Sequence, residues 1–295
     1  MQTHFERVAD SVYLLRVPHG GTTTGVILLR GEENYLIDAA GNAEEVEEYV
    51  VPALAELSLT PSDIACLVCT HTHADHIGGF ARLRALGVRS IAAYEKSVPK
   101  ILDPLTYNVE IRKAFPENSP PPSAGLTPTT VDTVLEDGDT VGNRLVLVAT
   151  PGHDDDAVCI YDRATETLIC GDSVQHNGTL VQGCALYMYL DGYRASMQKL
   201  RALAAKTVVL GHPFLPHGDV ICGREAVDAF FADALDTVDA YGAFVRAVWE
   251  SGERDLCTIA TKLVEHIGGV IPTHMFLPMY TVREHIRELE NENKK

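Results

Sequence analysis

Short apolar runs bounded by turn residues are the feature that most restricts the fold of this chain. Such runs, rich in Val, Ile and Leu, are typical of buried strands. They cover residues 12–17, 25–30, 34–38, 65–70, 90–94, 144–150, 157–162, 167–172 and 207–211. Segments with helical character lie between them at 42–57, 77–87 and 196–205. Strands mixed with helices, without strict alternation, predict an α/β protein with mixed sheets rather than a simple doubly wound sheet.

Four of these runs lead directly into histidine or aspartate. The run 65–70 is followed by "HTHADH", which supplies His71, His73, Asp75 and His76. The other three lead to His153, Asp172 and His212. If these strand ends share one edge of a sandwich, we expect five histidines and two aspartates in a single pocket. Imidazole and carboxylate are ligands for zinc, and also for iron or manganese. Seven ligands are too many for one four-coordinate zinc and suit two metals that share a carboxylate.

The stretches "HTHADH", "TPGHDDDAVCIY", "LICGDSV" and "LGHPF" resemble the metallo-β-lactamase superfamily over roughly residues 8–215. The resemblance implies an αββα sandwich of two mixed β-sheets flanked by helices, with the metals at one edge. It also implies the ligand sets, in which His71, His73 and His153 bind the first metal, Asp75, His76 and His212 bind the second, and Asp172 bridges them.

The expected function is that of a dinuclear zinc hydrolase acting on a small acyl substrate, which is a thioester, a lactone or an amide such as a β-lactam. Bound metal lowers the pKa of water from 15.7 to about 7, so a metal-bound hydroxide is available to attack the carbonyl. Asp75 is the candidate catalytic residue, which orients the hydroxide and moves a proton. Two alternatives stay open: a persulfide-dioxygenase-like oxidoreductase with one iron, and a phosphodiesterase of the same fold.

Three further polar residues are candidates for contact with substrate. His19 lies in the glycine-rich turn "PHGGTTTG", and His176 and Asn177 follow Asp172 closely. For each of them an ordinary polar residue without a role in the reaction is the simpler interpretation.

The chain divides into an expected catalytic domain, 1–220, and an expected C-terminal helical extension, 221–295. Within the first, residues 98–130 are rich in Pro, Ser and Thr and are interpreted as a lid-like insertion. In the second, apolar residues recur at helical spacing. The insertion and the extension are expected to set substrate choice or to form a homodimer.

Charge and composition exclude other classes of function. With 24 basic and 41 acidic residues the net charge is 24 − 41 = −17, which disfavours nucleic acid as a partner. No apolar run reaches the 18 or so residues of a membrane helix. The first residues lack the pattern of an export signal, and the seven cysteines show no disulfide-rich spacing. We therefore expect a cytoplasmic enzyme with a small-molecule substrate.

Overall fold

The computed structural model describes residues 4–123, 125–292 and 294, and its strands form two sheets. The seven-stranded sheet has the order β1-β2-β3-β4-β5-β6-β7 and the six-stranded sheet the order β13-β12-β11-β10-β9-β8. The first comprises β1 (Glu6–Ala9), β2 (Val12–His19), β3 (Thr22–Leu29), β4 (Asn34–Ile37), β5 (Ile64–Val68), β6 (Ile91–Tyr94) and β7 (Thr133–Leu135). The second comprises β8 (Thr140–Val141), β9 (Leu145–Ala149), β10 (Val158–Asp162), β11 (Thr167–Ile169), β12 (Thr207–Phe214) and β13 (Gly218–Cys222).

Both sheets are mixed, as the sequence predicted. In the first, β1 to β4 pair antiparallel and β4 to β7 pair parallel. In the second, only β11 and β12 pair parallel among the described strands. Alternate residues of a strand face opposite sides of a sheet, and β3 follows this rule. Ile27 and Leu29 join the apolar cluster between the two sheets, whereas Val26 and Leu28 face the outer helices.

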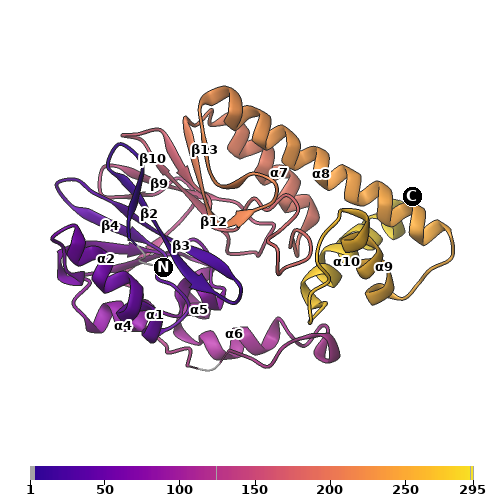
Figure 1. Cartoon of the computed structure of the whole chain (residues 1–295), viewed down its shortest axis with the longest axis horizontal. Helices are drawn as coiled ribbons and strands as arrows, with labels where there is room; N and C mark the ends of the chain where they lie inside the picture. The colour runs from indigo at the N-terminus through magenta and orange to yellow at the C-terminus, as the bar shows by residue number, and fades with distance from the viewer. Residues whose placement is uncertain (1–3, 124, 293, 295) are drawn as a thin grey trace.

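Helices cover the outer face of each sheet (Figure 1). The helical segments that cover the first sheet are α1 (Ala43–Glu45), the π-helical η1 (Val46–Val50), α2 (Val51–Glu56), α3 (Ala74–Ile77), α4 (Phe80–Ala85) and α5 (Ser97–Leu102). The helices that cover the second are α7 (Leu190–Ala202), α8 (Arg224–Glu250), α9 (Leu256–His266) and α10 (Phe276–Glu292). Single-turn 3₁₀ segments occur at η2 (Pro61–Asp63) and η3 (Pro116–Asn118). The predicted αββα sandwich with C-terminal helices is confirmed.

Two predicted element boundaries differ from the structure. The helix expected over 77–87 is divided into α3 and α4 at Gly78 and Gly79. A Cβ on either glycine would collide with the backbone of Ala39 or Gly41, so the double glycine permits a close approach of two backbones. The extension expected from 221 begins inside β13, and its first helix starts at Arg224.

The segment after β6 connects the two halves of the molecule. It contains α6 (Pro104–Glu110) and runs along one edge of the molecule toward α10 (Figure 1). There the hydroxyl of Tyr280 donates a hydrogen bond to the carbonyl of Ile111 at 2.6 Å, and the Tyr280 and Phe115 rings lie 5.1 Å apart. The lid-like role of residues 98–130 stays a prediction, but the structure attaches this segment to the C-terminal helices.

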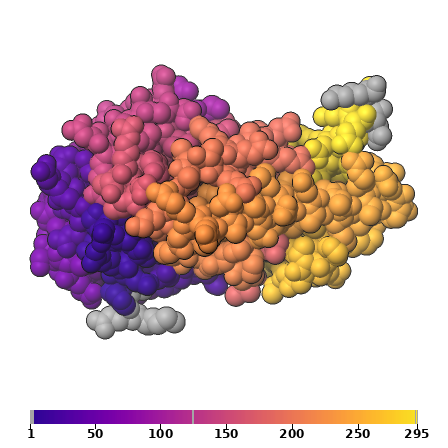
Figure 2. Space-filling model, turned by 90° about the horizontal axis from the view of Figure 1, so that it is seen from above, coloured from indigo at the N-terminus to yellow at the C-terminus, as the bar shows by residue number. Residues whose placement is uncertain are grey.

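The C-terminal helices form the end of the molecule remote from the first sheet, and α8 lies along the surface that faces the viewer in Figure 2. Buried residues of all three, such as Phe231, Ile259 and Val282, belong to the same apolar cluster as those on the outer face of the second sheet. The helices of the described chain include none with the length and apolar character required to cross a membrane. The cytoplasmic location and the homodimer stay predictions.

Candidate metal centre

The seven predicted ligand side chains lie together at one edge of the sandwich. His71 follows β5, His73 is the N-cap residue of α3, and Asp75 and His76 lie within α3. His153 follows β9 and Asp172 follows β11. The ligands therefore come from both sheets.

His212 differs slightly from its predicted place. It lies inside β12, which continues to Phe214 instead of ending at Gly211. The pairing of β12 with β13 changes register between Val209 and Phe214. Such an irregularity alters the direction of side chains, and His212 turns toward the other ligands.

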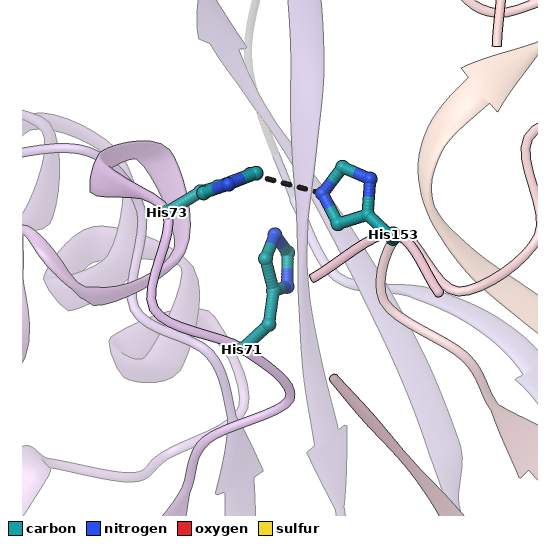
Figure 3. Close-up of side chains that lie close together, drawn as sticks. All are labelled: His71, His73 and His153. Atoms are coloured by element: carbon teal, nitrogen blue, oxygen red, sulfur yellow. Dashed lines mark hydrogen bonds between the residues drawn. The ribbon is translucent and has the colours of Figure 1, made fainter. Parts of the chain in front are cut away.

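His71, His73 and His153 form the first group (Figure 3). The three rings point toward one another, and Nδ1 of His73 lies 2.9 Å from Nε2 of His153. Nε2 of His71 is buried and has no hydrogen-bond partner among the described residues. Zinc–nitrogen bonds of 2.0–2.1 Å in tetrahedral geometry separate the two nitrogens by about 3.3 Å. The spacing therefore suits imidazoles that share one cation.

Asp75, His76 and His212 form the second group. Nε2 of His212 lies 3.0 Å from Oδ2 of Asp75 and 3.3 Å from Nε2 of His76. Nε2 of His76 lies 3.6 Å from the same carboxylate oxygen. Two nitrogens and one oxygen thus face a common point.

Asp172 lies between the two groups. Its Oδ1 is 3.4 Å from Nε2 of His76, and its Oδ2 is 3.4 Å from Nε2 of His212 and 3.8 Å from Nε2 of His153. Oδ1 is buried without a hydrogen-bond partner in the described part of the chain. A Cβ on the neighbouring Gly211 would collide with this carboxylate, so the absence of a side chain there gives Asp172 its space.

The outward-facing ring nitrogens show which atoms are free to bind metal. Nδ1 of His153 lies 3.0 Å from the carbonyl oxygen of Leu186, and Nδ1 of His212 lies 2.7 Å from the carbonyl oxygen of Thr23. A carbonyl only accepts hydrogen bonds, so Nδ1 of His212 carries a proton, and Nδ1 of His153 contacts both this type of acceptor and the amide nitrogen of Gln175 at 3.0 Å. Each Nε2 therefore points into the site, which is the arrangement of metal-binding histidines. These residues fit metal ions.

Asp38, which was not predicted from the sequence, contacts one of the candidate ligands directly. Its buried Oδ2 lies 2.8 Å from Nδ1 of His76, and the carboxylate also accepts hydrogen bonds from the backbone N–H and the hydroxyl of Thr70. The Thr70 hydroxyl in turn lies 3.1 Å from Nδ1 of His71. Asp38 follows β4 directly, so it carries the same strand-end signal as the predicted ligands.

Burial and charge set the protonation of the site. Burial lowers the pKa values of His71, His73 and His153, which therefore remain neutral and keep their lone pairs. At the second group burial lowers the pKa of His212, but Asp172 and Asp75 outweigh this effect and raise that pKa to about 10. Without an ion, His212 therefore carries a proton on Nε2 at neutral pH, stabilised by the two carboxylates, and a cation that binds there would displace this proton.

A cavity of about 270 Å³ opens above the two groups. Its walls come from the turn after β2, the segment around α6, the loop 175–188 and the start of α10. The lining residues other than metal-ligand candidates include His19, Asn108, Ile111, Arg112, Ser123, Gln175, Gln182, Leu186, Met188, Phe276, Leu277 and Tyr280. The contribution of α10 was not predicted from the sequence, because no local motif marks it.

The three predicted substrate residues differ in their positions. His19 lines the cavity, and its Nδ1 lies 3.0 Å from the Glu45 carboxylate, which raises the pKa of His19. His176 and Asn177 are not among the lining residues, and Gln175 occupies the wall instead. His176 has a positive φ of 45° and lies against Asp233, whereas Asn177 accepts a hydrogen bond from the hydroxyl of Tyr241.

The fold and this ligand set define a metallohydrolase class, and sequence comparison identifies the family. The model of the metallo-beta-lactamase superfamily matches residues 17–212, so the chain belongs to that superfamily. It is 26% identical over 219 residues to "Beta-lactamase-like protein 2 homolog" of Caenorhabditis elegans, which covers 70% of this chain and 63% of that protein. It is 27% identical over 210 residues to "Acyl-coenzyme A thioesterase MBLAC2" of Gallus gallus, with coverage of 66% and 72%.

Comparison of structures gives the same fold. A metallo-beta-lactamase family protein from Thermus thermophilus superimposes with a TM-score of 0.74 at 22% identity and covers 96% of this chain and 95% of that protein. Family membership, fold and a set of side chains that could hold metal therefore agree. The match spans less than two thirds of the worm relative.

Proposed function

We propose that the two ligand groups bind a pair of zinc ions and that the enzyme hydrolyses acyl thioesters. The observation that carries this proposal is the position of Asp172 between the two groups, at the base of a cavity whose walls combine polar and apolar side chains. His71, His73 and His153 hold one ion, and Asp75, His76 and His212 hold the other. Iron or manganese satisfies the same donor types and is the alternative metal.

The ions, when bound, lower the pKa of water and polarise the substrate carbonyl. The protein residues then have separate tasks. Asp75 is partly exposed toward the cavity, where its carboxylate accepts the proton of the attacking water. The apolar side chains of Leu186, Met188 and Phe276 surround the acyl group and exclude water from it.

Three considerations favour a thioester. The relative from Gallus gallus is named an acyl-coenzyme A thioesterase. A thiol has a pKa near 8.5, so it leaves as a thiolate without a strong acid, whereas an amide nitrogen requires protonation. The net charge of −17 disfavours long polyanionic substrates, which argues against the phosphodiesterase alternative.

A metal count combined with a substrate screen tests this proposal. We expect two tightly bound zinc ions per chain after exposure to a weak chelator, and kcat/KM for acyl thioesters at least ~10-fold above that for lactones, β-lactams and phosphodiesters, a margin of about 1.4 kcal/mol. A single iron with oxygen uptake on persulfide would establish the dioxygenase alternative. Preference for a lactone, a β-lactam or a phosphodiester would overturn the thioester assignment while leaving the metal assignment intact.

A further inference from the structure

A second cluster of metal-ligand side chains lies outside the cavity. It consists of His176 in the loop after β11, His217 in the turn between β12 and β13, and Asp233 on α8. One ligand atom from each residue lies within 4.8 Å of the other two. None of the three lines the cavity, so the proposed hydrolysis does not account for this cluster.

The geometry of the cluster suits a small cation. Oδ2 of Asp233 lies 3.1 Å from Nδ1 of His176 and 2.8 Å from Nε2 of His217. Ligand atoms around a tetrahedral zinc are separated by about 3.3 Å, so small side-chain movements would admit the ion. The rings of His176 and His217 are 4.3 Å apart, and Phe230 packs 4.4 Å and 5.3 Å from them.

The protonation of the cluster also suits a cation. Burial lowers the pKa of His176 to about 4, so the imidazole is neutral at physiological pH and retains a lone pair. The pKa of Asp233 lies below its usual value, chiefly because of its hydrogen bond with His217, so the carboxylate is ionised. Two imidazoles and one carboxylate form a donor set typical of zinc.

We propose that His176, His217 and Asp233 bind a further divalent transition metal ion of the zinc type. The side chains of His217 and Asp233 are 30% and 50% exposed, so solvent has access and water supplies the remaining ligand. The ion joins three elements: the loop that follows Asp172, the β12–β13 turn and α8, which lies on the surface in Figure 2. Its role is to fasten α8 to the second sheet.

The competing explanation is that Asp233 simply accepts hydrogen bonds from both histidines. Zinc titration of wild type and of the variants His217→Gln and Asp233→Asn separates the two, with His4→Gln as a matched control at an exposed position. At saturating zinc we expect wild type and the control to bind one equivalent more than either cluster variant. We also expect zinc to raise the melting temperature of wild type by about 5 °C more than that of His217→Gln.

Equal zinc counts in all four proteins would overturn the proposal. Crystals of wild type grown with zinc give a second measurement that needs no variant. We expect an anomalous peak at the zinc edge between the three side chains, and its absence beside occupied hydrolytic sites would equally overturn the proposal. His217→Gln is expected to keep wild-type kcat and KM, so this outcome is independent of the hydrolytic function.

Discussion

At the scale of single residues, the oxygen atoms that contact the Nδ1 atoms of the histidines are as important for the geometry of the site as the candidate ligands themselves. The carbonyl oxygens of Leu186 and Thr23 and the Asp38 carboxylate fix the orientation of His153, His212 and His76, respectively. Such partners hold each ring in one tautomer and increase the basicity of its inward nitrogen. The site is therefore arranged for metal by residues that do not touch it.

Replacing a ligand tests the centre directly. We expect Asp75→Ala, and equally His71→Ala, to lower kcat/KM for a thioester by about 10²–10⁴-fold or more, because the proton acceptor or a metal ligand is lost. Far-UV circular dichroism should show an unchanged fold. Turnover near the wild-type rate in either variant would contradict the assignment of these residues.

Asp38→Asn tests the partner of His76. The amide preserves size but removes the charge that stabilises His76 and Thr70. We expect metal affinity or kcat/KM to fall by about 10–100-fold. Metal affinity can be measured by competition with a chelator, with Asp10→Asn, at an exposed position, as the control. An unchanged affinity would show that Asp38 serves the fold alone.

At the scale of elements, α10 forms one wall of the cavity although it lies far from the candidate ligands in the sequence. Tyr280 lines the cavity, stacks edge-to-face on Phe115 and bonds to the carbonyl of Ile111. These contacts connect the segment around α6 with the C-terminal helices. Substrate choice is therefore expected to depend on both.

Truncating the Tyr280 side chain tests that dependence. We expect Tyr280→Ala to raise KM by about 10-fold with kcat nearly unchanged, because a wall of the cavity is lost while the metal ligands remain. Tyr280→Phe keeps the ring and should retain a KM close to wild type. A fall in kcat at constant KM would instead place Tyr280 in the chemical step.

The sequence predicted the clustering of the seven candidate ligands better than the walls of the cavity. His153, Asp172 and His212 could be assigned because each accompanies a strand, and strand ends are visible as local patterns. Asp38 carried that signal too, but a lone aspartate without a neighbouring histidine is indistinguishable from a turn residue.

Other features depend on contacts between distant segments, which no local pattern contains. Tyr280 reaches Ile111 only because of how the helices pack, and His176 turns from the cavity toward α8. The short strand β8 has two residues, too few for an alternation of apolar and polar positions to be recognised. The fold class was predictable because longer strands and the ligand motifs agreed.

At the scale of the whole molecule, a buried ion pair joins the two sheets at the edge opposite the metal centre. Arg144, just before β9, contacts Asp162 at the end of β10 through two hydrogen bonds of 2.6 Å. The same guanidinium donates to the hydroxyl of Ser11 and the carbonyl of Arg30, which flank β2 and β3. The Arg144 side chain thus connects both sheets of the sandwich.

Asp162→Ala tests this connection. Removing one member of a buried pair leaves the other charge uncompensated, so we expect the free energy of unfolding in urea to fall by about 3–5 kcal/mol at pH 7. Glu47→Ala, which removes an exposed pair with Arg82, is the control and should cost less than about 1 kcal/mol. Equal effects of the two substitutions would contradict the proposed connection.

The same pair predicts a dependence on pH. Burial opposes ionisation of Asp162, but hydrogen bonds from Arg144 and Thr165 outweigh it and hold the pKa below the ordinary 3.8. The folded state therefore favours the carboxylate, and the stabilisation is present above pH 3.8 and lost as the pH falls below it. The difference in stability between wild type and Asp162→Ala should narrow under those acidic conditions.

The origin of the ligands in both sheets has a consequence for biosynthesis. On the proposed assignment His71 is made early in translation, whereas a first ion would also need His153 and a second would need His212, the last of the seven candidate ligands in the sequence. The second of the two sites would therefore form only after β12 has been synthesised and has joined the second sheet. On this assignment we expect the complete metal centre to assemble late in maturation, after both sheets have formed.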